Sequence, residues 1–332
     1  HILGLHNQID HCFFSGKSNL GVVLSINFSV DQPNYHRIEH NYFGPRPYLG
    51  INGCETIRIG DSTQSSKISR TTVAHNLFEG CSGEAEIITN KSCENYFQSN
   101  TFRKCQGALT LRHGDRSVVE GNFFLGEGEK STGGVRVIGE GHRIWNNYFC
   151  DLTGSGARAA LSIHNGVPNS PVGLYHQVKD LEVAHNTFVN NHQNVLVGYY
   201  RGKDGAVLPP VRTVIANNII WGKSAPLVQL DEKKAEIKYE GNIFFGAKSG
   251  LPTSEGIRFI NPALRKDKLG IYRLRGDSVA RAKAKGSYPQ ITRDMDGQKR
   301  PRKKDIGADQ YSSEPIALKP LTTNEVGPAW KR

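Results

Sequence analysis

The sequence lacks the features that indicate a membrane-spanning, helical or zinc-binding protein. None of its apolar runs is long enough to cross a membrane, and no stretch of useful length has the pattern of an amphipathic helix. Cysteines never occur with the Cys-x-x-Cys spacing of common zinc sites, so zinc is not expected. The six cysteines are Cys12, Cys54, Cys81, Cys93, Cys105 and Cys150. At 332 residues and 37% hydrophobic content, the chain can still bury a long core.

Acidic residues are scarce in the last quarter of the chain, and this is where the positive charge gathers. Residues 258–332 contain 18 lysines and arginines but only 8 aspartates and glutamates, so they carry +10 of the formal net charge of +11. The rest of the chain is close to neutral. We expect the basic run at 299–304 to be a solvated surface. It has no interleaved aromatic residues and matches no known nucleic-acid module, so no nucleic-acid partner is predicted.

An Asn-x-Phe motif, or a close variant, recurs along most of the chain. The asparagines are Asn41, Asn76, Asn100, Asn122, Asn147, Asn186, Asn218 and Asn242. Most of them follow the previous one after about two dozen residues, and the longer intervals indicate insertions into this basic unit. A degenerate copy, His11-Cys12-Phe13, precedes them by one more repeat. Periods of this length are typical of solenoids.

Among solenoids, a parallel β-helix fits best. The Leu-x-x-Leu-x-Leu spacing of leucine-rich repeats is absent, whereas strand-like segments such as 109–111, 135–137 and 181–183 alternate and are separated by Gly and Asn. We predict a β-helix over residues 1–262 and a basic segment, 263–332, that packs on or closes the helix within the same domain. The chain begins at His1 as if already inside a coil, so we expect a processed or truncated N-terminus whose upstream coils are missing.

The repeated asparagines and phenylalanines are predicted to be structural. Each Asn can lie at a turn, adopt a left-handed backbone conformation and stack its amide on the next coil, while the Phe two residues later points inward. Cys81 and Cys105 both follow their Asn by five residues and should stack in adjacent coils. Side chains in register on parallel strands point the same way, so we expect a buried thiol stack rather than a disulfide.

Charged and polar residues recur at similar distances after the asparagines of successive coils. Counted from those asparagines, they are Asn52 at +11, Glu84 at +8, Glu86 at +10, Lys91 at +15, Arg112 at +12, His113 at +13 and Arg136 at +14. The alternation with aliphatic residues suggests that these side chains point outward together, in one column of the β-helix. A merely solvated face is the alternative for any single residue.

These residue types suit elimination chemistry on an acidic sugar. Glu84, Glu86 and the side-chain carbonyl of Asn52 are hard oxygen ligands of the kind that Ca²⁺ prefers, and a bound ion could neutralise a uronate carboxylate. Lys91 could then remove the C5 proton, while Arg112 stabilises the developing charge and protonates the departing O4. The two glutamates could instead be the acid and base of a glycoside hydrolase. Placed on one strand face, however, they would lie on the same side of a sugar, which favours metal binding.

Four segments around these residues resemble polysaccharide lyase family 6, which comprises alginate lyases and the dermatan-sulfate-cleaving chondroitinase B. They are residues 52–60 (Asn-Gly-x-Glu-x-Ile-Arg-Ile-Gly), 83–92, 109–114 (Leu-Thr-Leu-Arg-His-Gly) and 133–136 (Gly-Gly-Val-Arg). The similarity runs from about residue 40 to the end, including 294–298 and 305–309.

The resemblance implies a right-handed parallel β-helix that holds Ca²⁺ through Asn52, Glu84 and Glu86. It implies Lys91 as Brønsted base and Arg112 as Brønsted acid. The side chains that it implies for substrate binding are Arg58, His113, Arg136 and Tyr175.

The resulting prediction is a calcium-dependent lyase that cleaves an acidic polysaccharide, with alginate favoured, by β-elimination. Dermatan or chondroitin sulfate is the alternative substrate, and a non-catalytic carbohydrate-binding β-helix is the alternative class. The resemblance also implies a secreted or periplasmic location in a bacterium. The sequence leaves the oligomeric state and the choice between mannuronate and guluronate open.

Overall fold

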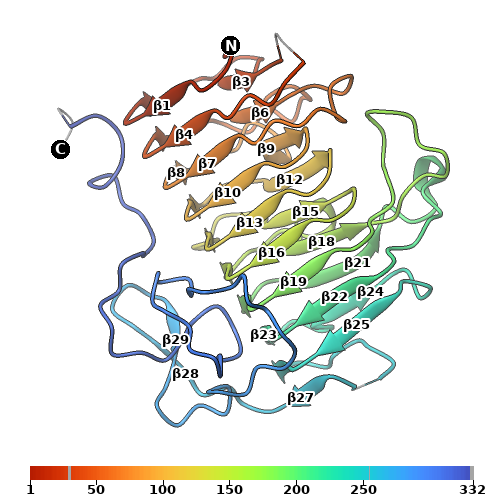
Figure 1. Ribbon diagram of the computed structural model, residues 1–332, viewed down its shortest axis with the longest axis vertical. Helices are drawn as coiled ribbons and strands as arrows, with labels where there is room; N and C mark the ends of the chain where they lie inside the picture. Colours follow the sequence, from red (N-terminus) through yellow and green to blue (C-terminus); the bar gives the residue numbers. More distant parts are fainter. Residues whose placement is uncertain (29–30, 254, 330–332) are drawn as a thin grey trace.

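Each repeat of the chain forms three short strands, and the corresponding strands of successive repeats pair in parallel. The computed structural model describes residues 1–28, 31–253 and 255–329. Its coils stack from the N-terminus, red at the top of Figure 1, to residues near 260. Three parallel sheets run along the stack, so the predicted parallel β-helix is confirmed. No helix in these residues is long and apolar enough to cross a membrane.

The strands of one coil follow each other around the helix axis, one strand for each sheet. The first sheet contains β1 (Gln8–Asp10), β4 (Arg37–Glu39), β7 (Thr72–Ala74), β10 (Tyr96–Gln98), β13 (Val118–Glu120), β16 (Arg143–Trp145), β19 (Glu182–Ala184), β22 (Thr213–Ala216) and β25 (Ile237–Glu240). The second contains β2 (Phe13–Phe14), β5 (Tyr42–Phe43), β8 (Leu77–Glu79), β11 (Thr101–Arg103), β14 (Phe123–Leu125), β17 (Tyr148–Cys150), β20 (Thr187–Val189), β23 (Ile219–Gly222), β26 (Asn242–Gly246) and β27 (Ile257–Phe259).

The third sheet contains β3 (Leu24–Ile26), β6 (Ile57–Ile59), β9 (Glu86–Lys91), β12 (Ala108–His113), β15 (Val135–Val137), β18 (Leu161–His164), β21 (Val195–Tyr199) and β24 (Val228–Leu230). Outside the three sheets lie an antiparallel pair, β28 (Leu264–Lys266) and β29 (Tyr272–Leu274), and two short 3-10 turns, η1 (Gly156–Arg158) and η2 (Lys203–Gly205).

The asparagine ladder forms between the first and second sheets. Each ladder amide donates to the side-chain oxygen of the next Asn; Asn76, for example, donates to Asn100 at 3.0 Å, and Asn100 to Asn122 at 3.0 Å. All eight predicted asparagines are fully buried. Because every buried amide has partners above and below, the ladder satisfies polar groups that would otherwise destabilise the core.

One detail of the ladder differs from the prediction. The left-handed backbone conformation occurs at the residue before each Asn, as at His40, His75 and Asn146, whose φ angles are 54°, 53° and 53°. The Asn itself is then free to present its amide along the stack. Glycine at 121 and 241 occupies the same left-handed position, where L-residues are strained.

The inward phenylalanines stack ring on ring along the core. Phe43, Phe78 and Phe102 have neighbouring ring centroids 4.8 and 4.7 Å apart. In the first coil the ring that continues this stack is Phe14, 4.9 Å from Phe43, rather than Phe13. The alignment of His11 with the ladder is therefore wrong by one residue: the amide of Cys12 donates to the Asn41 oxygen at 2.9 Å, in the place of a ladder Asn.

The cysteines that were expected to stack are buried and free. Cys81 and Cys105 are 2% and 3% exposed, and neither is in a disulfide. Their thiols donate to the carbonyl oxygens of Phe43 and Phe78, which belong to successive coils, at 3.2 and 3.4 Å. Burial raises the pKa of Cys105, as expected for a thiol without a nearby cation.

The C-terminal segment runs along the outside of the helix and then back toward the first coils (Figure 1). Ile271, Met295 and Ala308 pack on Phe123 and Tyr148 of the second sheet. Other residues of the segment form three further apolar contacts: Tyr288 and Ile291 with β16, β19 and β22, Leu274 and Ile306 with β23 and β26, and Val326 with β5 and β8. The division of the chain at residue 262 stays a prediction.

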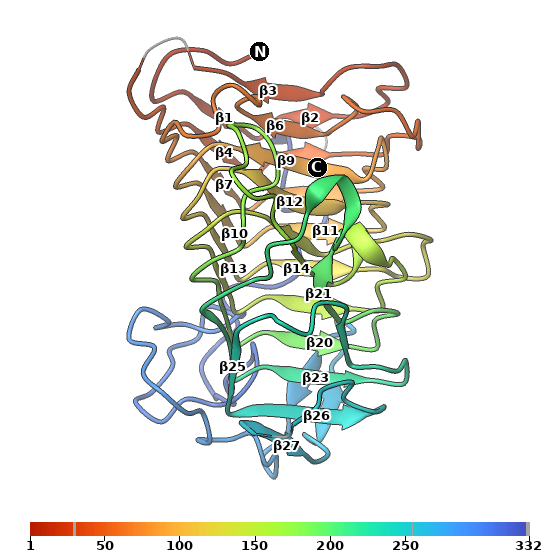
Figure 2. The ribbon, with the colours of Figure 1, turned by 90° about the vertical axis from the view of Figure 1, so that its right-hand side faces the viewer.

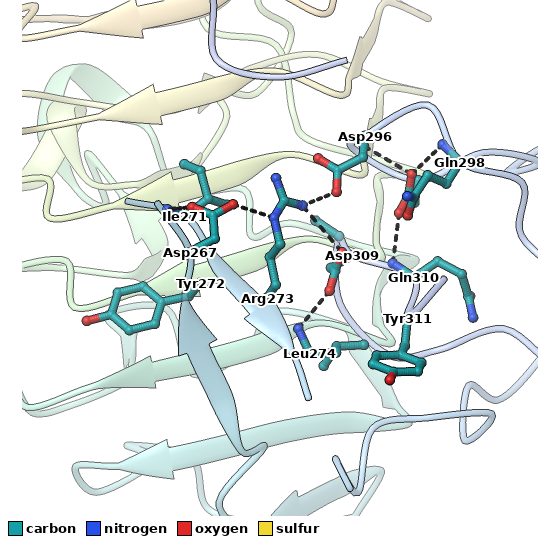
Figure 3. A network of polar contacts seen from close by, with 12 residues as sticks. Asp267, Ile271, Tyr272, Arg273, Leu274, Asp296, Gln298, Asp309, Gln310 and Tyr311 are labelled. Carbon is teal, nitrogen blue, oxygen red and sulfur yellow. Dashed lines mark hydrogen bonds and ion pairs between the residues drawn. The ribbon is translucent and has the colours of Figure 1, made fainter. Parts of the chain in front are cut away.

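A polar network fixes this segment internally (Figure 3). Arg273 forms ion pairs with Asp296, with Asp267 at 2.6 Å and with Asp309 at 3.6 Å. The second Asp309 oxygen accepts the Leu274 amide at 2.7 Å. The network ties β29 to two loops that lie more than twenty residues away in the chain.

The basic run 299–304 is not uniformly solvated as predicted. Arg300 is 5% exposed and donates to the Asn146 side-chain oxygen at 2.9 Å and to the carbonyl oxygen of Gly307 at 2.8 Å. It therefore anchors the segment to the turn that precedes the ladder Asn. Its neighbours Lys299, Arg302 and Lys303 are exposed.

Candidate active site

The outer face of the third sheet carries the residues singled out from the sequence. Its longest strands, β9 and β12, have six residues each, twice the length of most others. Loops near residues 165–177 and 199–208, green in Figure 2, pass in front of this sheet. The loops therefore turn an ordinary β-helix face into a partly covered polar site.

The strand register separates the residues that were expected in one column. Arg58 of β6 pairs with Thr89 of β9, Thr89 with Thr110 of β12, and Thr110 with Arg136 of β15. Lys91, two residues after Thr89 on β9, pairs with His113 of β12 and so lies in a different column. The prediction of a single column is therefore wrong, because counting from the ladder Asn ignores the irregularities that interrupt the pairing of β9 with β12.

Three carboxylates gather at the start of β9. Glu84 lies in the bend before the strand, not on it, and its carboxylate accepts the backbone amides of Gly53 at 3.1 Å and Cys54 at 3.0 Å. Burial and the charges of Glu55 and Glu86 raise the pKa of Glu84 to about 7. Glu55 is 2% exposed, and one of its oxygens is buried without a hydrogen-bond partner. The negative charge here is therefore incompletely compensated.

Glu86 connects this acidic end of the site to its arginines. Its carboxylate forms an ion pair with Arg136 at 3.0 Å, approaches Arg112 at 3.9 Å and accepts the Thr89 hydroxyl at 2.6 Å. Arg136 and Glu86 are 9% and 13% exposed in their side chains. Because this pair is shielded from water, removal of either partner would leave a buried charge without compensation.

Arg112 lies between the sheet and the covering loop. Its guanidinium lies over the Tyr175 ring, 4.1 Å from the centroid, and burial lowers its pKa. The neighbouring His113 contacts the same loop through its Nδ1 atom, 3.1 Å from the Leu174 carbonyl oxygen. Burial, Arg112 and Lys91 lower the pKa of His113 to about 3. The imidazole is therefore neutral, with its proton on Nδ1 and its Nε2 available as an acceptor.

Sequence reasoning missed a histidine behind Arg136. The Nε of Arg136 donates to His164 Nε2 at 2.8 Å, and His164 is fully buried, with ring contacts to Tyr175, Tyr199 and Tyr200. No charge pattern marks His164. Its only signal is its position in an alternating strand, 161–164, one coil beyond Arg136.

The structure places the other predicted residues around this centre. Asn52 is exposed in the turn before Gly53, and the backbone amide of Gly53 donates to the Glu84 carboxylate. Arg58 and Lys91 are half-buried on the outer face, on β6 and at the end of β9. Tyr175 comes from the covering loop. Glu55 also belongs to this site. It is part of the motif at 52–60, but no feature of the sequence indicated a role for it.

The acidic end of the site fits a calcium ion. Glu55, Glu84 and Glu86 provide hard carboxylate oxygens, and the partnerless oxygen of Glu55 and the raised pKa of Glu84 fit a site that a cation would complete. The opposite end holds a lysine, an arginine and a neutral histidine. Such an arrangement can neutralise an acidic sugar, remove a proton from it and stabilise developing charge.

Comparisons with known proteins identify relatives of this chain. The family model described as chondroitinase B matches residues 1–266. Among solved structures, the PL6 family alginate lyase AlyGC is 33% identical, with a TM-score of 0.83 over 98% of this chain and 41% of that one. A mannuronic acid specific polysaccharide family 6 lyase from human gut microbiota is 34% identical, with a TM-score of 0.68 over 77% of this chain and 59% of that one.

The chain thus spans 41% of the length of AlyGC and 59% of the gut lyase. The search of curated proteins returned no match. The family model nevertheless covers most of the chain, and these two solved relatives share a third of its aligned residues. This chain belongs to polysaccharide lyase family 6, the family of chondroitinase B and the PL6 alginate lyases.

Proposed function

We propose that this chain is the catalytic β-helix of a calcium-dependent lyase that cleaves alginate by β-elimination. The observation that carries the proposal is the outer face of β9 and β12. There Lys91 and His113 are paired in register, Arg112 precedes His113 on the same strand, and three carboxylates lie at one end. A non-catalytic carbohydrate-binding protein would have no need to bury Arg112 beside a carboxylate cluster.

Calcium is proposed to bind at Asn52, Glu84 and Glu86, with Glu55 behind them. When bound, the ion would neutralise the substrate carboxylate and so acidify the proton on C5. Glu84 is held in place by the amides of Gly53 and Cys54, and Glu86 by Arg136. The ligands are therefore already oriented by the fold.

Lys91 is proposed as the base and Arg112 as the acid of the elimination. Lys91 takes the C5 proton, the electrons of the C5–H bond form the C4=C5 double bond, and the C4–O4 bond breaks. Arg112 stabilises the negative charge that develops and supplies a proton to O4, and the ring of Tyr175 holds its guanidinium in position. One product carries the unsaturated uronide.

Four neighbouring side chains are proposed to bind the sugar chain. Arg58 and Arg136 lie in one register column, where they would contact substrate carboxylates in sugars next to the reacting one. Neutral His113 offers its Nε2 as an acceptor for a sugar hydroxyl. The ring of Tyr175, which covers Arg112, would contact the bound sugar.

Alginate is favoured because the relatives at 33% and 34% identity are described as an alginate lyase and a mannuronic acid specific lyase. Dermatan or chondroitin sulfate stays the alternative because the matching family model is described as chondroitinase B. An enzyme that degrades such polymers acts where they occur, so we also propose a secreted or periplasmic location.

The test is an ultraviolet assay for the new double bond on polymannuronate, polyguluronate and dermatan sulfate. We expect an increase in absorbance on alginate blocks, its loss after exhaustive chelation and its return with Ca²⁺. An increase on dermatan sulfate alone would support the proposed lyase activity but would show that the substrate is dermatan sulfate and not alginate. Full activity without metal would contradict the calcium site, and no product from any polymer, with Ca²⁺ present and the fold intact, would contradict the lyase.

A further inference from the structure

A cationic hollow lies on the C-terminal segment, away from the third sheet. It has a volume of about 380 Å³ and is lined by nine residues, 289, 291–293, 299–302 and 304, of which five are Lys or Arg and none is acidic. The segment here packs through Ile291 on Trp145, Ala184 and Ala216, which belong to the first sheet. The hollow and the candidate active site are therefore on different faces of the β-helix.

The fold holds these cations together against their mutual repulsion. Arg293 and Lys299 are bridged in an antiparallel hairpin, so two like charges lie directly opposite each other, which is an unfavourable pairing. Arg300 is buried at the base of the hollow, and burial together with Arg300 lowers the pKa of Lys304. This concentration of positive charge is built into the segment and does not come from a flexible tail.

Nearby carboxylates offset the charge of Arg300, but in the described part of the chain they form no ion pair with the other four cations. Among the described residues, Arg293, Lys299, Arg302 and Lys304 form no ion pair with an acidic side chain. Asp294 and Asp305 act on Arg300 and direct their hydrogen bonds to backbone amides. Asp294 accepts the amides of Asp296, Gln298 and Gln310, while Asp305 accepts those of Ala282 and Tyr311. Glu314 accepts the Lys299 backbone amide, not its ammonium group.

We propose that this hollow is a second binding site for the anionic polysaccharide, occupied by carboxylates of the same chain or a neighbouring chain of polymer. This rests on the proposed function for the identity of the anion. A polymer with one carboxylate per sugar can engage several of these cations at once, and attachment at a second face raises its effective concentration near the active site. The lining contains no aromatic ring on which a nucleobase could stack, which disfavours single-stranded nucleic acid.

The test is charge reversal at the rim of the hollow. We compare Lys299→Glu/Arg302→Glu with the matched control Lys223→Glu/Lys248→Glu, which changes the net charge equally at exposed lysines that are not part of the hollow. Affinity electrophoresis in gels that contain alginate, with Lys91→Ala added to both variants to prevent cleavage, measures binding. Thermal melts confirm that each variant is folded, and Lys299→Gln/Arg302→Gln replaces the reversal variant if it is not.

We expect the hollow variant to bind the polymer at least about fivefold more weakly than the control, with a weaker salt dependence. With Lys91 restored, its kcat/KM should fall on long polymer and stay unchanged on short oligosaccharides. Equal retention of the two variants would overturn the second site. Preferential retention by a polynucleotide or by inorganic phosphate would overturn the identity of the ligand. Binding is measured without cleavage, so a failure of the lyase proposal would be seen separately, in the ultraviolet assay.

Discussion

The molecule contains two clusters of carboxylates that differ in how their charge is compensated. Asp294, Asp296 and Asp309 have ligand atoms within 4.8 Å of one another, the only such acidic group in the described part of the chain, and Arg273 lies against them. The cluster of Glu55, Glu84 and Glu86 is looser, and its arginines also contact a tyrosine and a histidine. Proximity of acidic groups therefore does not by itself distinguish a site for chemistry from a structural clamp.

The neighbours of the two clusters differ more clearly. The glutamates share a face with a lysine, an arginine and a neutral histidine, and the last two contact the loop that covers the sheet. The aspartates accept backbone amides from β29 and from two loops, as a structural clamp does. We infer that the glutamate cluster serves the reaction and the aspartate cluster holds the C-terminal segment. The predictions below test this division.

Lys91→Ala should have the largest effect. Loss of a general base costs about 10²- to 10⁴-fold in kcat, while substrate binding and thermal stability change little because Lys91 is half-buried on the outer face. Turnover in the ultraviolet assay and a thermal melt measure both. The matched control is Lys238→Ala, on the first sheet. Near-normal turnover of Lys91→Ala would remove the base from this position.

Arg273→Ala should be the most destabilising single change in the aspartate cluster. It leaves the two buried carboxylates of Asp296 and Asp309 without their cation, which we expect to lower the free energy of unfolding by about 3 to 5 kcal/mol. The folded fraction should keep its activity. Arg112→Ala should do the reverse, with activity lost and the denaturant midpoint nearly unchanged. If Arg112→Ala mainly unfolds the protein, the charges on the third sheet are structural.

Calcium should stabilise the protein through the glutamates only. A ligand present at 100 times its Kd stabilises the folded state by about 2.7 kcal/mol, so the melting temperature should rise on addition of Ca²⁺. Glu84→Gln should abolish this rise, whereas Asp309→Asn should leave it. The opposite result would place the ion in the aspartate cluster and would show that the glutamates do not bind calcium.

The sequence predicted best what repeats from coil to coil. The ladder and the phenylalanine stack follow from a motif whose meaning is local, and their positions were correct in every coil except the first, where Cys12 replaces Asn. The left-handed position was displaced by one residue because the Asn uses its side chain, not its backbone, to continue the turn. The sequence also selected residues that the structure brings to one face, and their catalytic and binding roles stay predictions.

What the sequence could not provide depends on distance along the chain. Irregular pairing between β9 and β12 shifts the register, so no count from the ladder places Lys91 beside His113. Tyr175 and His164 reach Arg112 and Arg136 from later coils. The network around Arg273 joins β29 to two loops, and charge balance suggested only that the basic run 299–304 was a solvated surface.

The aspartate cluster should also give the protein a mild pH dependence of stability. Burial raises the pKa of Asp296 to about 8 and that of Asp309 to about 6, above the value near 3.9 of an unfolded aspartate. The folded state therefore binds more protons, so this contribution is fully present below about pH 4 and is lost as the pH rises through 6 to 8. Thermal melts between these limits should show a falling melting temperature. Asp309→Asn should flatten the decline between about pH 4 and 6, because its amide keeps the Leu274 contact without a titrating group. An identical slope in the variant would show that the cluster does not titrate in this range, and that Arg273 compensates its charge completely.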